Sequence, residues 1–178
     1  GQRQAALERF DDMLLLDPLN RYVMASRAHL MGQLGNKHGA ITALQALTNA
    51  HPNHSAGWFN LGFTLDDMGC HLDAEPAFRR AIQAEPKMDR AWYGLALLLI
   101  KERRFDEAVE ALKINTELQP MSPYGWVQLA RVHADREEPD EALPPDELLE
   151  PLRDREPIGQ RLGAARHLDQ RALHRVDL

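Results

Sequence analysis

Two histidines three positions apart, His51 and His54, have the spacing in this chain that most resembles a metal site. On one helix that spacing would place both imidazoles on the same face, where they could share a metal ion. Pro52 stands between them and indicates a turn, and no cysteine or carboxylate follows at a matching interval. Because structural zinc sites use four ligands, we expect neither a metal nor any other cofactor.

Paired carboxylates are the second group of residues that could support catalysis. They occur at Asp66–Asp67 and Glu137–Glu138. Neighbouring positions on a helix point in different directions, so neither pair can act together as acid and base. The chain also has no glycine-rich phosphate loop and no nucleophile elbow. We therefore predict no catalytic residues and a protein that is not an enzyme.

Composition narrows the choice of partner. A net charge of −6 and an isoelectric point near 5.7 argue against nucleic acid or an anionic membrane surface. No run approaches the roughly 18 apolar residues of a membrane span, so membrane insertion is not expected. Cys70 is the single cysteine, which excludes an intrachain disulfide. The compartment stays open: we favour the cytoplasm, or the bacterial periplasm if a leader preceded Gly1.

The elements that carry these residues follow a strict repeat of 34 residues, which is clearest in the tryptophans at 58, 92 and 126. Prolines and alanines keep the same interval: Pro18, Pro52, Pro86, Pro120, and Ala6, Ala40, Ala74, Ala108, Ala142. A register held without insertion indicates one supersecondary unit repeated in a stack.

The residue types within a period are specific. In the third period they are Trp58, Leu61, Gly62 and Leu65, followed by Ala74, Phe78, Ala81 and Pro86. This pattern resembles the tetratricopeptide repeat. The resemblance implies an all-α fold, a right-handed superhelical solenoid of antiparallel helix pairs that serves as a non-catalytic scaffold for binding proteins. We expect Gly62 to let two helices approach closely and the tryptophans to fill the space between neighbouring pairs.

The repeat register divides the chain into an array, 1–143, and a C-terminal segment, 144–178. The predicted array consists of a half repeat at 3–20, repeats at 21–54, 55–88 and 89–122, and a partial repeat at 123–143. After Pro157, apolar residues recur at steps of three and four, which predicts a capping helix near 158–176. Pro76 should bend the second helix of its repeat or delay its start to near Glu75.

The resemblance also implies that the first helix of each repeat lines the concave inner face. Large apolar residues stand on that face outside the packing positions, which predicts a groove that captures a segment of a protein or peptide partner. The candidate groove residues are Tyr22, His29, Phe59, Asn60, Phe63, Arg90, Tyr93, Leu97, Tyr124 and Arg131. The alternative is that the apolar members thicken the core between the helices.

Two groups of proteins within the family have known binding residues on this concave inner face. Chaperone-binding members clamp a terminal carboxylate, and only Asn60 and Arg90 match that clamp. Protein O-glycosyltransferases carry an inner asparagine ladder, of which only Asn60 is present. Two other functions stay open: a recruitment arm cut from a larger enzyme such as a glycosyltransferase, and a homo-oligomeric scaffold joined through the array ends or the C-terminal segment.

Overall fold

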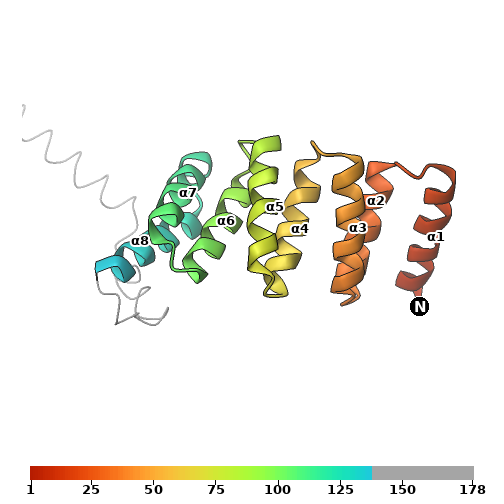
Figure 1. The fold of residues 1–178 in the computed structure, drawn as a ribbon, viewed down its shortest axis with the longest axis horizontal. Helices are drawn as coiled ribbons and strands as arrows, with labels where there is room; N and C mark the ends of the chain where they lie inside the picture. Colours follow the sequence, from red (N-terminus) through yellow and green to blue (C-terminus); the bar gives the residue numbers. More distant parts are fainter. Residues whose placement is uncertain (138–178) are drawn as a thin grey trace, which may run out of the picture. The chain divides into compact units, whose positions relative to one another are not determined.

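The computed structural model describes residues 1–137, and these form helices without any strand (Figure 1). In chain order the helices of this part are α1 (Gln2–Leu16), α2 (Arg21–Gln33), α3 (Lys37–Ala50), α4 (Ser55–Asp67), α5 (His71–Ala84), α6 (Asp89–Lys101), α7 (Phe105–Leu118) and α8 (Pro123–Glu137). The predicted capping helix near 158–176 and the end of the partial repeat lie outside the described residues. No helix within residues 1–137 has the length and apolar character to cross a membrane.

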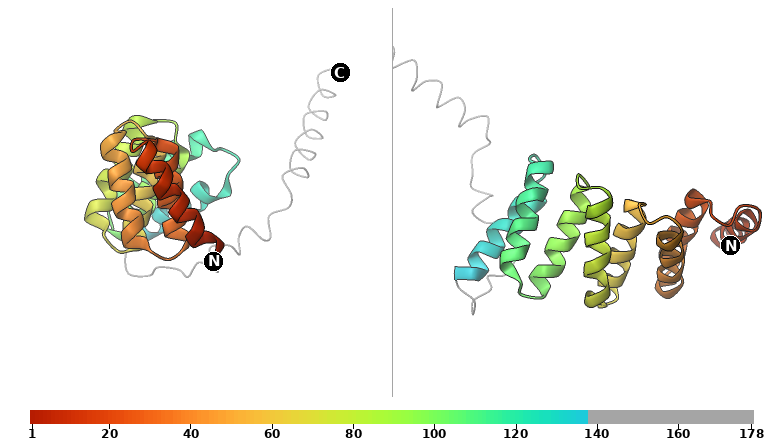
Figure 2. Two further views of the ribbon diagram at one scale, coloured as in Figure 1. Left: turned by 90° about the vertical axis from the view of Figure 1, so that its right-hand side faces the viewer. Right: turned by 45° about the horizontal axis from the view of Figure 1, so that its top comes forward.

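Consecutive helices pack against one another along the described chain, most extensively within the pairs α2–α3, α4–α5 and α6–α7 (Figures 1 and 2). Short connections make the members of each pair antiparallel neighbours, which is the geometry of an αα-hairpin. The result is the predicted all-α solenoid of antiparallel helix pairs. In repeat phase, α2, α4, α6 and α8 are first helices, and α1, α3, α5 and α7 are second helices.

The turn inside each pair has the same backbone conformation. Gly35 and Gly69 take positive φ angles of 79° and 76°, and Arg103 takes 58° at the equivalent position. This left-handed conformation ends a helix and is most favourable for glycine. The same turn conformation therefore recurs at 34-residue intervals in these three helix pairs.

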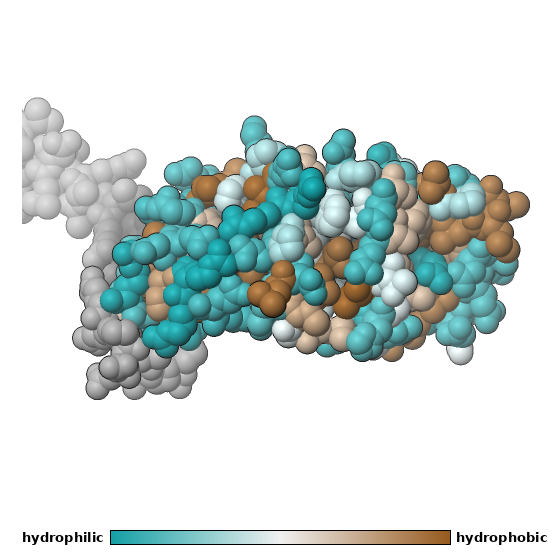
Figure 3. Space-filling view, in the orientation of Figure 1, coloured by the Kyte–Doolittle hydropathy of each residue, from teal (hydrophilic) through white to brown (hydrophobic). Residues whose placement is uncertain are grey.

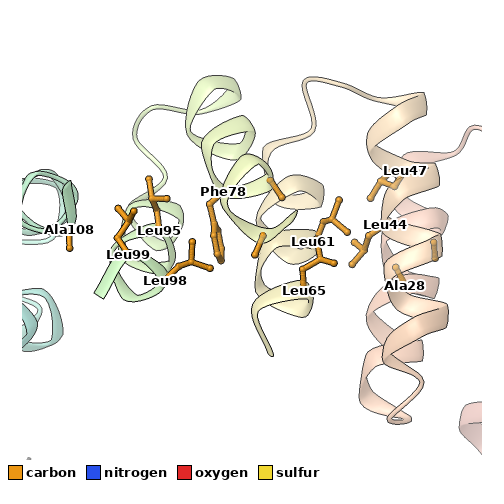
Figure 4. Packing of buried hydrophobic residues seen from close by; sticks show 13 residues of the cluster. Ala28, Leu44, Leu47, Leu61, Leu65, Phe78, Leu95, Leu98, Leu99 and Ala108 are labelled. Atoms are coloured by element: carbon orange, nitrogen blue, oxygen red, sulfur yellow. The ribbon is translucent and has the colours of Figure 1, made fainter. Parts of the chain in front are cut away.

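The main core forms where second helices meet the first helices on both sides (Figure 4). Phe78 of α5 is its largest fully buried side chain, with 1% of its surface exposed. A Cβ atom built on Gly62 would lie 3.0 Å from the Phe78 ring, and one on Gly94 would lie 2.7 Å away. The predicted close approach at Gly62 is confirmed, and Gly94 serves the same ring from the next repeat.

The first described helix, α1, has no buried residue and exposes several large apolar side chains (Figure 3). These are Met13, Leu15 and Leu16, all at least 49% exposed, and Leu19 in the following connection is also exposed. The positions equivalent to Met13 are filled by Leu47 and Ala81, which are completely buried. Their helices, α3 and α5, each pack against the first helices on both sides, whereas the main contact of α1 is with α2.

The delayed start predicted for the helix around Pro76 is wrong. Helix α5 begins at His71 and continues to Ala84 with Pro76 inside it. Proline removes one backbone donor and crowds the preceding turn, but the helix is continuous through it. Its buried residues, including Ala74 and Phe78, hold it in place on both sides of the proline. The other expectation, a bend at Pro76, stays a prediction.

Candidate functional site

A pocket of about 400 Å³ opens between the first helices α2 and α4, above the second helix α3. Its lining consists of Ala28, His29, Gly32 and Gln33 from α2, Lys37, Ala40 and Leu44 from α3, and Phe59, Asn60, Phe63, Thr64 and Asp67 from α4. Ala28, Ala40 and Leu44 are buried, with no more than 3% of each exposed. A pocket with an apolar floor and a few polar groups suits a side chain or small ligand.

Two phenylalanines of α4 form one wall of this pocket, and they differ in exposure. The ring centroids of Phe59 and Phe63 lie 6.3 Å apart, with an angle of 29° between the ring planes. Phe59 is half-buried and also lies 6.1 Å from the core ring of Phe78. Phe63, one turn later, is 59% exposed. Because most of the Phe63 ring is exposed to water, burial of that ring under a partner would be energetically favourable.

Arg90 of α6 lies beside the phenylalanine wall. Its guanidinium carbon is 5.1 Å from the centroid of the Phe59 ring, within the range of a cation–π interaction. Its side chain is exposed, and it forms no ion pair with any residue in 1–136. The Arg90 guanidinium is therefore available to a carboxylate that arrives from outside.

Polar groups at the edge of the pocket can orient a bound chain. The Asn60 side-chain amide makes no hydrogen bond within the described part of the chain and carries both donors and an acceptor. His29 shares a hydrogen bond with Gln33, with 2.9 Å between their side-chain nitrogens. Lys37 and Asp67 form an ion pair across the rim. The free amide is suited to the backbone of an extended partner segment.

The structure brings four of the predicted groove residues together in the pocket, His29, Phe59, Asn60 and Phe63, with Arg90 adjacent. The other five do not line it: Tyr22, Tyr93, Leu97, Tyr124 and Arg131. Tyr22 and Tyr124 are at least 68% exposed, whereas Tyr93 is half-buried and packs against a core cluster. Phe59 is also half-buried, and both rings pack against core clusters.

Sequence reasoning missed the floor of the pocket and its α2 side. Leu44 and Ala40 belong to the second helix α3, whereas the resemblance predicts a groove lined by first helices. Gly32 and Ala28 are small, and a pattern search for large apolar residues passes over them. Gly32 could have been found by comparing repeats, because the equivalent position one repeat later holds a larger residue, Asp66.

The histidine pair has structural roles. The Nδ1 atom of His54 accepts a hydrogen bond from the backbone N–H of Gly57 at 2.9 Å and caps the N-terminus of α4. His51 bonds through Nε2 to the Leu19 carbonyl at 2.7 Å. Burial, together with the nearby Arg21 and His51, lowers the pKa of His54. A neutral Nδ1 lone pair is what the cap requires.

The adjacent carboxylates Asp66 and Asp67 point to different partners. Asp66 forms an ion pair with Lys101, with 2.7 Å between oxygen and nitrogen, and a hydrogen bond with His71. Asp67 pairs with Lys37. Within residues 1–136, no group of three or more histidines, cysteines or carboxylates could hold a metal ion.

Comparison with known proteins identifies the family. Residues 68–126 and residues 24–54 each match a family described as tetratricopeptide repeat. The same repeat register runs through the helix pairs, their turns and their buried residues. The chain belongs to the tetratricopeptide repeat family.

Similar proteins share parts of this chain. Human protein O-mannosyl-transferase TMTC3 is 32% identical over 125 residues, which cover 68% of this chain and 13% of that protein. The chain spans between 7% and 19% of the length of the curated relatives it matches.

Solved structures show the same fold. A crystal structure of MamA has a TM-score of 0.73 at 20% identity, covering 80% of this chain and 83% of that one. The first tetratricopeptide repeat domain of Spaghetti (RPAP3), bound to the HSP90 peptide SRMEEVD, has a TM-score of 0.64 at 14% identity, covering 66% and 94%.

Proposed function

We propose that this chain is a non-catalytic interaction module that captures a segment of a partner protein on the face that carries the α2–α4 pocket. The observation that supports the proposal is the position of Phe63, an exposed ring at the mouth of a pocket with a buried apolar floor. Tetratricopeptide repeat folds generally act as protein-binding scaffolds, and one structural neighbour holds a peptide. The described site has no constellation of catalytic groups, and its polar residues are suited to orienting a chain.

Photocrosslinking tests the proposal at the site itself. A photoreactive phenylalanine analogue at position 63 should crosslink the native partner, and the same analogue at Leu72 provides the matched control. Leu72 is 88% exposed on α5 and does not line the pocket. Equal crosslinking yields from both positions would contradict capture in the groove.

Truncation supplies the second readout. Phe63→Ala should lower the yield of partner in a pull-down by at least tenfold, because buried aromatic anchors contribute about 2 kcal/mol or more to binding. Leu72→Ala should leave the yield unchanged, and both variants should keep the thermal midpoint of the parent. If Phe63→Ala retains the partner at the parental level, the binding surface lies elsewhere.

A further inference from the structure

The α2–α4 pocket is lined on its α2 side by Gly32, where the next two repeats carry larger residues. Gly32 occupies the register position that Asp66 and Ile100 fill in the next two repeats. A Cβ atom built on Gly32 would meet no atom within 4 Å. The repeat pattern therefore leaves room for one apolar side chain that the protein itself does not supply.

The charges around the groove leave one cation without a partner. Asp66 and Asp67 at the C-terminal end of α4 already form ion pairs, Asp66 with Lys101 and Asp67 with Lys37. Arg90 forms no ion pair with any residue of 1–136 and lies over the Phe59 ring. The chain as a whole has a net charge of −6, so Arg90 places a positive charge beside the pocket of a negatively charged protein. That positive charge favours an acidic group in the partner.

The distance between the pocket and Arg90 determines how far apart the two contacting residues must lie in a bound segment. Phe59 separates them, so a bound segment must cross from the α2–α4 gap to the first turn of α6. Packed helices lie about 8–10 Å apart, and an extended chain advances about 3.3 Å per residue. The two contacts are therefore about three residues apart in an extended partner.

We propose that the groove selects a segment with an apolar side chain and an acidic residue about three positions apart. The apolar side chain enters the pocket over Gly32 and covers Phe63, and the carboxylate pairs with Arg90. This inference rests on the proposed function, since it specifies what the same groove binds. It names the chemistry of the partner and not its identity.

Short fluorescein-labelled peptides in a glycine–serine background test the selectivity with the full chain. The first peptide carries one Phe and one Glu about three positions apart. The others replace Glu with Gln or Arg, or Phe with Ala. Fluorescence polarisation should rank Phe/Glu at least tenfold tighter than Phe/Gln, with Phe/Arg weaker still. Equal dissociation constants for Phe/Glu and Phe/Gln would overturn the acidic half of the proposal.

Two variants separate the two halves without touching the core. Arg90→Glu should invert the preference, so that Phe/Arg binds more tightly than Phe/Glu. Gly32→Leu should fill the pocket and weaken binding of Phe/Glu at least tenfold. A Cβ atom at this position meets no neighbour, and an unchanged thermal midpoint would show that the fold is preserved. Arg80→Glu, on exposed α5 surface outside the pocket, should leave all the peptide affinities unchanged. If Gly32→Leu binds like the parent, the pocket is not the anchor site.

The outcomes also distinguish this inference from the proposed function. If no peptide binds while crosslinking of the native partner still depends on position 63, the selectivity is wrong and groove capture stands. If crosslinking from position 63 equals that from position 72, groove capture itself is wrong, and the selectivity that rests on it is withdrawn with it.

Discussion

The indole N–H of Trp58 donates a hydrogen bond to the main-chain carbonyl of Pro52, with 2.7 Å between nitrogen and oxygen. This bond ties the first helix of a repeat to the turn that precedes it. It fixes the position of the indole relative to the turn, while the proline keeps its own register because it cannot continue the preceding helix. The bond recurs in the two following repeats, from Trp92 to Pro86 at 2.9 Å and from Trp126 to Pro120 at 3.0 Å.

Replacing the tryptophans should show a position-dependent loss of stability. Trp92→Ala should lower the free energy of unfolding by about 3 kcal/mol, near the lower end for a large aromatic, because the ring is half-buried. Trp126→Ala should cost less, since that ring is 50% exposed. Trp92→Phe keeps most of the ring and should cost about 1 kcal/mol for the lost hydrogen bond. Urea unfolding measures all three, and a larger loss at Trp126 than at Trp92 would contradict the ranking.

Glycine-to-alanine substitutions should change stability in opposite directions at two helical sites. Gly94→Ala should destabilise the protein by about 1–3 kcal/mol, because its Cβ would lie 2.7 Å from the buried ring of Phe78. Gly32→Ala should stabilise it by about 0.5 kcal/mol, because alanine favours the helix and meets no neighbour. Urea midpoints measured on the two variants side by side give the answer. A gain at Gly94 would mean that the Phe78 ring can move aside.

The fold was predictable because local signals and the repeat register agree. Leu44 and Phe78 are buried at equivalent positions, as the 34-residue period requires. Capping could also be inferred, since Asn20 accepts a bond from the Val23 N–H at the position that His54 occupies one repeat later. What periodicity cannot give is the side-chain network between repeats, which depends on rotamers of residues far apart in sequence.

Arg104 illustrates that limit. It lies between α6 and α7 and forms ion pairs with Glu75 at 2.6 Å and Glu107 at 2.8 Å. Its hydrogen bonds to these groups hold the pKa of both carboxyls below their usual values. Arg79, which sequence position alone assigns to a solvated face, also pairs with Glu75 and Glu107. The groove could be predicted only in part. The sequence shows its aromatic wall as a stripe of large residues on one helix face, but the depth of the groove comes from small residues.

The histidine cap of α4 should make stability depend on pH. The folded protein lowers the pKa of His54 from its ordinary value of 6.5, so the unfolded chain binds this proton more readily. Stability contributed by the neutral cap is complete above pH 6.5 and is lost as the pH falls from there through the folded pKa. His54→Asn should keep the cap, as Asn20 does at the equivalent position, and remove this component.

Thermal midpoints at pH 8 and pH 5.5 test this prediction. The drop between the two conditions should be smaller for His54→Asn than for the parent. His38→Asn is the matched control, because that histidine is exposed and caps no helix. If His54→Asn and the parent lose the same amount on acidification, protonation of the cap does not contribute.

Truncating Phe59 and truncating Phe63 should have different effects on stability but the same effect on binding, although the two rings lie only 6.3 Å apart. Phe59→Ala should lower the free energy of unfolding by about 2–3 kcal/mol, because its half-buried ring packs against Phe78 in the core. Phe63→Ala should change it by less than about 0.5 kcal/mol, as expected for an exposed side chain. Both should weaken capture of the partner, since Phe59 supports Phe63 and carries Arg90 over its face. Urea unfolding and partner pull-down on the same preparations compare the two effects. A large loss of stability in Phe63→Ala would place that ring in the core and remove the main support for the groove.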